Sequence, residues 1–126
     1  MDRLKRKIDK YLIDWKNSPN KLPLIIKGAR QIGKTNAIRN FGKNNYESFI
    51  EINFALEPEF KTIFDRTFNV DEIIKEITIR RPEIVLKPQN TLIFFDEMQE
   101  CVSTATSLKS FREDGRYDVI CSGSLM

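Results

Sequence analysis

The sequence contains no histidine and only two cysteines, Cys101 and Cys121. The absence of histidine excludes zinc sites of the Cys/His type and catalytic triads that use a histidine base. Two cysteines are too few for a disulfide framework, so we expect both to be core or strand-end residues.

Long apolar segments are absent as well. No apolar run approaches the roughly 18 residues of a membrane span, and residues 1–7 have no apolar stretch suited to a signal peptide. Hydrophobic residues make up 40% and charged residues 31% of the 126 residues, a composition typical of soluble globular proteins. We therefore expect one domain with a single core, a cytoplasmic location and no association with a membrane.

The charge is unevenly distributed along the chain. Residues 1–46 contain twelve Lys and Arg against three Asp and Glu, whereas residues 47–126 contain nine against fifteen. A basic half of this kind is compatible with nucleic-acid binding. We favour the simpler interpretation of a solvated helix face beside a phosphate-binding site.

The hydrophobic pattern predicts alternating helices and strands. We expect strands at 22–26, 48–53, 91–95 and 117–121, and helices at 3–16, 33–41, 70–79 and from 103 through 111, with a short helix after Pro58. Residues 1–20 would form an amphipathic helix and linker, and residues 21–126 an α/β core: three layers, with a parallel sheet of about four strands and helices on both faces.

Three local expectations accompany this pattern. The continuous apolar character of strand 22–26 predicts burial on both of its faces. Gly42 is expected to end helix 33–41, since glycine commonly terminates helices. Ser103 or Thr104 is expected to cap the helix that runs through Phe111.

The segment from Gly28 to Thr35 matches the pattern Gly-x-x-x-x-Gly-Lys-Thr of the phosphate-binding P-loop, between a strand and a helix. Glycine at the two framing positions permits tight turns against the phosphates. Backbone amides would surround the β and γ phosphates, Lys34 would contribute a charge, and the Thr35 hydroxyl would bind Mg²⁺. The expected nucleotide-binding residues are Gly28, Gln31, Ile32, Gly33, Lys34 and Thr35.

Two acidic residues, Asp96 and Glu97, stand at the carboxyl end of the buried strand 91–95. The carboxyl ends of strands form the ligand crevice in open α/β sheets. Asp96 fits the carboxylate that holds Mg²⁺, and Glu97 the general base that polarises the attacking water. On their own the two acids could be a solvated strand end, but their combination with the P-loop predicts a nucleotide site, with Glu97 and Lys34 as catalytic residues.

Polar residues follow the last strand, where Ser122 and Ser124 could sense the γ-phosphate or the attacking water. The alternative is a plain serine-glycine loop. Tyr11 or Trp15 could stack on adenine, but aromatic residues on an apolar helical stripe are more often part of the core.

The P-loop segment 24–35, the segment Asp-Glu-x-Gln at 96–99 and the strand ending in Gly-Ser at 123–124 together resemble a known family. It is the AAA-type ATPase core of prokaryotic ATP-binding proteins, in which a C-terminal domain of unknown function follows. The resemblance covers essentially the whole chain. It implies sheet order 5-1-4-3-2, ATP with Mg²⁺ as ligands, and the roles already given for Lys34, Thr35, Asp96 and Glu97. Gln99 matches the family motif without an established role.

The chain ends directly after the fourth strand. Compared with the family, the fifth strand, the helical lid and the C-terminal domain would be missing, together with any arginine that they supply. The first strand would then be an unpaired apolar edge, which favours pairing with a partner or with the missing part.

Three functions remain open at this point. The first is an ATPase core that binds Mg·ATP and hydrolyses it to ADP and phosphate to drive conformational change in the complete protein. The second is a nucleotide-binding or interaction module without turnover. The third is a small-molecule kinase, against which Glu97 counts, because an acceptor hydroxyl replaces water in kinases.

Overall fold

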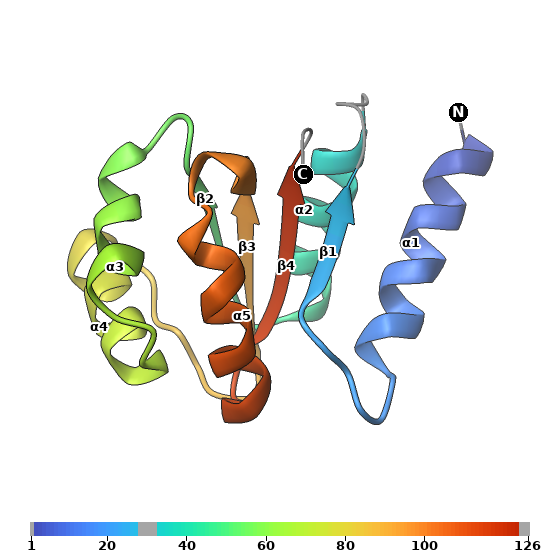
Figure 1. Cartoon of the computed structure of the whole chain (residues 1–126). Coiled ribbons are helices and arrows are strands. Elements are labelled where there is room, and N and C mark those ends of the chain that lie inside the picture. The colour runs from blue at the N-terminus through green and yellow to red at the C-terminus, as the bar shows by residue number, and fades with distance from the viewer. Residues whose placement is uncertain (1, 28–32, 124–126) are drawn as a thin grey trace.

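The computed structural model describes the backbone of residues 2–27 and 33–123, with side chains from Lys7 onward within these ranges. Its centre is a parallel four-stranded sheet with the order β1-β4-β3-β2 (Figure 1). The strands are β1 (Leu24–Lys27), β2 (Ser48–Asn53), β3 (Thr91–Asp96) and β4 (Asp118–Gly123). The predicted α/β class is confirmed, and the order agrees with the 1-4-3-2 part that the resemblance implied.

Helices cover both faces of the sheet and complete the three predicted layers (Figure 1). The helices are α1 (Asp2–Lys16), α2 (Lys34–Asn45), α3 (Lys61–Arg66), α4 (Val70–Arg80) and α5 (Ser103–Asp114), with 3-10 turns η1 (Pro58–Phe60) and η2 (Met98–Glu100). Apart from the end of α2, the expected bounds agree with these to within three residues. No helix in the described ranges is long and apolar enough to cross a bilayer.

Alternation along each strand divides the interior into two clusters. In β3, Ile93 and Phe95 belong to the larger cluster with α3, α4 and α5, whereas Leu92 and Phe94 belong to a smaller cluster with α1 and α2. Because successive strand residues point to opposite faces, the sheet itself separates the two clusters. We expected a single core, and the sheet splits it in two.

Strand β1 lies at the edge of the sheet and pairs, within the described residues, with β4 alone. Leu24 and Ile26 pack against the smaller cluster, but Ile25 on the opposite face is 39% exposed. The prediction that this strand is buried on both faces is therefore wrong. Apolar composition indicates which strands can be buried, and the position in the sheet decides which are.

Gly42 does not end α2, which continues to Asn45. The glycine is buried against the ring of Phe49, and a Cβ atom at this position would lie 2.2 Å from Phe49 Cδ1. Close packing, and not helix termination, therefore explains this glycine.

The expected cap of α5 is also absent. The N-cap residue is Val102, and no side chain caps the first turn. Thr104 is fully buried, and its Oγ1 has no hydrogen-bond partner. Because Val102 occupies the N-cap position, Ser103 and Thr104 lie within the first turn of the helix and not at its cap.

Helix α1 packs on α2 through Leu12, which is fully buried, and Trp15. The Trp15 ring lies 6.4 Å from that of Phe41, and its Nε1 donates a hydrogen bond to the carbonyl of Leu22 at 2.8 Å. Trp15 thus has a core role. The division of the chain at residue 20 stays a prediction.

Candidate functional site

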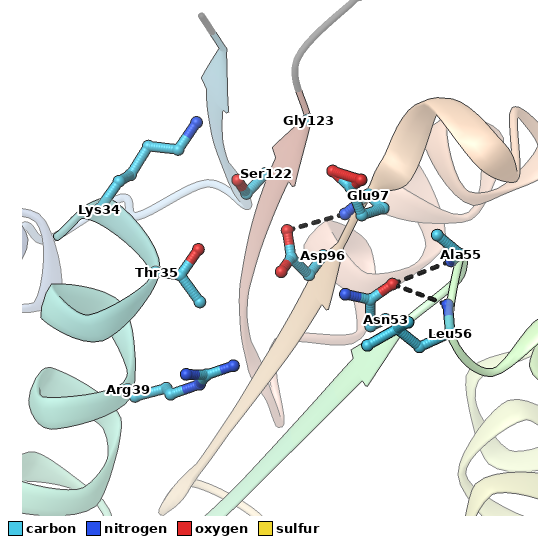
Figure 2. A pocket seen from close by; sticks show the side chains of 10 residues that line it. All are labelled: Lys34, Thr35, Arg39, Asn53, Ala55, Leu56, Asp96, Glu97, Ser122 and Gly123. Carbon is cyan, nitrogen blue, oxygen red and sulfur yellow. Dashed lines mark hydrogen bonds between the residues drawn. The ribbon is translucent and has the colours of Figure 1, made fainter. Parts of the chain in front are cut away.

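The carboxyl ends of β2, β3 and β4 and the first turns of α2 enclose a cavity of about 350 Å³ (Figure 2). It lies where open parallel sheets bind their ligands. The residues that line it are Lys34, Thr35, Arg39, Asn53, Ala55, Leu56, Asp96, Glu97, Ser122 and Gly123.

Helix α2 presents its N-terminus to this cavity. Gly33 has φ 101°, a left-handed conformation that glycine adopts at low cost, and its carbonyl accepts the first helical bond, from Ala37 N, at 2.8 Å. As the N-cap residue, Gly33 has no side chain that could accept the first N–H groups of the helix, and a bound anion could accept them instead. Lys34 and Thr35 line the cavity as expected. Gly28, Gln31 and Ile32 lie outside the described residues.

Asp96 continues the face of β3 that points toward α2, after Leu92 and Phe94. Asp96 is only 9% exposed, and its Oδ1 accepts the N–H of Glu97 at 2.8 Å. Burial raises the pKa of Asp96, the N–H of Glu97 opposes this effect, and the negative charges of Glu97 and Glu51 reinforce it. The cavity thus holds a carboxylate that would gain from a nearby cation.

Glu97 stands directly after β3 in a left-handed conformation, with φ 55° and ψ 47°. A residue other than glycine or asparagine is rarely found there, because the conformation costs about 1 kcal/mol or more. The turn separates Glu97 from the direction of the strand while keeping its side chain at the cavity (Figure 2). Both neighbouring acids therefore line the cavity, Asp96 as the last residue of β3 and Glu97 from the turn that follows it.

Ser122 lies on β4, between the strand that precedes the P-loop and the strand that carries Asp96. It is paired with Ile26 of β1 and is 2% exposed. It lines the cavity, and its role as a sensor stays a prediction. Ser124 lies outside the described residues.

Arg39 and Asn53 also line the cavity but were not predicted from the sequence. Asn53 ends β2, and its Oδ1 accepts the N–H groups of Ala55 and Leu56 at 2.9 and 3.0 Å (Figure 2). The rule that ligands bind at strand carboxyl ends, applied to β2, could have found Asn53. Arg39 follows Thr35 by one helical turn, a weaker signal.

Three residues considered from the sequence are not among those that line the cavity: Tyr11, Trp15 and Gln99. Gln99 lies in η2, and its Oε1 is buried without a hydrogen-bond partner. Its motif position still has no role.

The oxygen atoms at the cavity suit Mg²⁺. Thr35 offers a hydroxyl and Asp96 a buried carboxylate, and Mg²⁺ is commonly bound by one or two protein oxygens together with phosphates and water. Within the described ranges, no group of three or more His, Cys, Asp or Glu could hold a metal by itself. A cation that shares its coordination with a bound phosphate fits this donor set.

A family model described as "AAA domain" matches residues 20–126. Among solved structures, the chain is similar to the structure of C. elegans PCH-2, with a TM-score of 0.46 and 16% identity; the match covers 96% of this chain and 34% of that one. No curated protein matches. Because the family model spans most of the sequence, the chain belongs to the AAA domain family, a family of nucleotide-binding ATPases.

Proposed function

We propose that the chain binds Mg·ATP in this cavity and, in the complete protein, hydrolyses ATP to ADP and phosphate to drive conformational change. The observation that carries the proposal is the convergence of Lys34, Thr35, Asp96, Glu97 and Ser122 on one cavity from α2, β3, β4 and the turn after β3. These residue types are the ones that phosphoryl transfer to water requires.

Each side chain has a role that follows from its place. Lys34 compensates the charge of the β and γ phosphates, together with the N–H groups at the start of α2. Glu97 accepts a proton from the water that attacks the γ-phosphate. Ser122 contacts the γ-phosphate or that water. Residues Gly28, Gln31, Ile32 and Gly33 would supply the remaining backbone contacts, and Ser124 a second sensor.

Thr35 and Asp96 would hold Mg²⁺. The ion, when bound, would neutralise charge on the phosphate oxygens. The buried position of Asp96 helps here, because a carboxylate shielded from water attracts a cation more strongly than an exposed one.

The first test is thermal unfolding of the chain with and without Mg·ATP. A ligand that binds only the folded state raises the midpoint, by an amount equivalent to about 2.7 kcal/mol at a concentration of 100 Kd. We expect Lys34→Ala to lose this rise. Lys43→Ala is the matched control, since Lys43 is an exposed lysine on the same helix. A rise of equal size in both variants would refute the assignment of the site.

The second test separates hydrolysis from binding. Glu97→Gln keeps the size of the side chain but removes the base, so we expect nucleotide binding to persist while phosphate release by the complete protein falls by about 100-fold or more. Undiminished turnover in this variant would contradict the role of Glu97 as the base.

A binding module without turnover is the second candidate. The observation in its favour is the edge position of β1, with Ile25 partly exposed, because a further strand there would complete the sheet. Binding of Mg·ATP by the wild type, without phosphate release even in the complete protein, would select this candidate. The partner would then be the complete protein or another chain.

A further inference from the structure

One ion pair lies next to the cavity and has no part in the proposed chemistry. The guanidinium of Arg39 on α2 contacts the carboxylate of Glu51 on β2 with two hydrogen bonds, from Nε to Oε1 at 2.6 Å and from Nη2 to Oε2 at 2.8 Å. Such a two-point contact orients the guanidinium. It fixes a second cation, besides Lys34, at the cavity wall.

The pair lies one helical turn along α2 from Thr35 and two residues along the sheet from Asp96, the residues proposed to hold Mg²⁺. Arg39 follows Thr35 by four residues on α2, a rise of about 6 Å. On the sheet, Asn53 is paired with Asp96, whereas Glu51 is paired with Phe94, two residues earlier. Figure 2 shows the guanidinium extending from α2 toward the sheet, on the side of Asp96 away from Ser122.

The bridge is partly accessible to solvent, since the Arg39 side chain is 43% exposed and that of Glu51 20%. Asp96, in contrast, is nine-tenths buried. Once released, an arginine side chain beside a buried carboxylate would gain more from that carboxylate than from water.

Two cations can therefore compete for Asp96, one from the solution and one from the protein. Burial raises the pKa of Asp96, and the positive charge of Arg39 offsets a small part of this rise, while the hydrogen bonds to Glu51 raise the pKa of Arg39. These electrostatic effects agree with the geometry. Glu51 accepts the two shortest hydrogen bonds of the guanidinium, and Asn36 Oδ1 accepts a longer one from Nη1 at 3.4 Å.

We propose that Glu51 is a positioning residue that holds Arg39 away from Asp96, so that the cavity stays open to a divalent cation. Arg39 is then the internal competitor of Mg²⁺, and the ion pair sets the affinity of the site for the metal. The inference rests on the proposed function, since it concerns the same Mg²⁺ site.

The test is a MgCl₂ titration at a fixed ADP concentration, followed by the thermal unfolding midpoint. We expect Glu51→Gln to weaken Mg²⁺ binding about two- to fivefold, because the freed guanidinium occupies the space beside Asp96. Glu51→Ala should act in the same direction and at least as strongly. Arg39→Met should bind Mg²⁺ as tightly as the wild type or more tightly, and the double variant Glu51→Gln/Arg39→Met should match Arg39→Met.

Glu47→Gln is the control for the charge change, because Glu47 lies just before β2 and pairs with Lys87, not with a residue of the cavity. It should leave the Mg²⁺ affinity unchanged. A bridge that only ties α2 to β2 would be lost equally in Glu51→Gln and Arg39→Met, so weaker binding in both variants would overturn the inference. Unchanged binding in both Glu51 variants would overturn it as well.

The two proposals fail in different ways. If the wild type shows no Mg²⁺-dependent response to ADP that Lys34→Ala abolishes, the nucleotide site itself is refuted, and the inference with it. If the wild type responds and the Glu51 and Arg39 variants do not diverge, the inference alone is refuted.

Discussion

At the scale of single residues, two backbone positions shape the cavity, and both have positive φ: Gly33 at 101° and Glu97 at 55°. Glycine adopts this conformation at low cost, whereas glutamate does not. The hydrogen bond from Glu97 N to Asp96 Oδ1 helps to hold the second turn. The left-handed turn places the acid at the wall of the cavity. Backbone strain of this kind often accompanies functional sites, which agrees with the proposed role of Glu97.

Asp96→Asn tests the energetic consequence of burial at this position. The folded state raises the pKa of Asp96 above its ordinary value of 3.8, chiefly through burial. The contribution of Asp96 to stability is therefore fully present below pH 3.8 and is lost as the pH rises through the folded pKa. Without nucleotide, we expect the variant to unfold at a higher temperature than the wild type at pH 7, with the difference vanishing near pH 3.

Calorimetry across this pH range would check the prediction. The amide oxygen of asparagine can still accept the Glu97 N–H, so the turn is kept in the variant. We also expect the variant to lose the Mg²⁺-dependent rise with nucleotide. A lower midpoint than that of the wild type at pH 7, with the difference vanishing near pH 3, would show instead that Asp96 stabilises the fold in its ionised form.

Much of the cavity could be predicted at this scale, and the reason is chemical. Lys34, Thr35, Asp96 and Glu97 belong to motifs whose spacing fixes their surroundings, so they meet as expected. Arg39 depends on its partner Glu51, which is twelve residues away and on another element. No local pattern contains that pairing, and three-dimensional packing alone reveals it.

At the scale of elements, helix α2 combines two requirements: its first turn faces the cavity, and its later turns pack between α1 and the sheet. Its interior glycine, Gly42, allows the ring of Phe49 to approach the helix backbone. The sequence contains both residues but does not reveal that the Phe49 ring packs on Gly42, so the glycine was interpreted as the end of the helix. The periodic apolar pattern predicted where the helices and strands lie, but it does not predict which residues of different elements contact one another.

Gly42→Ala tests this explanation. In a helix interior, alanine is ordinarily more stabilising than glycine by about 1 kcal/mol. Here the new Cβ would lie 2.2 Å from the Phe49 ring, and crowding of this kind costs about 1–3 kcal/mol. We expect a lower unfolding midpoint in the wild-type background and a higher one in a Phe49→Ala background. Denaturant unfolding of the four proteins measures the coupling, and stabilisation in both backgrounds would contradict it.

At the scale of the whole molecule, the two apolar clusters differ greatly in size. Among the described residues, nineteen buried side chains form the cluster with α3, α4 and α5, whereas six form the cluster with α1 and α2. The candidate site lies on the side of the smaller cluster, since α2 carries Lys34 and Thr35. The composition predicts enough apolar residues for a core. How these residues are divided between the two faces of the sheet depends on the order of the strands, which the composition does not give.

The unequal clusters have a consequence for local unfolding. Within the described residues, the layer of α1 and α2 contributes fewer buried apolar side chains than the opposite layer, so we expect it to open on its own, at a free energy below that of global unfolding. We expect amide hydrogen exchange in α2 to be faster than in β3, and Mg·ATP to slow it selectively in α2. Equal protection of both elements in the free protein would contradict this expectation. Bound nucleotide would thus stabilise the layer of α1 and α2 against local unfolding, adding contacts that its small apolar cluster lacks.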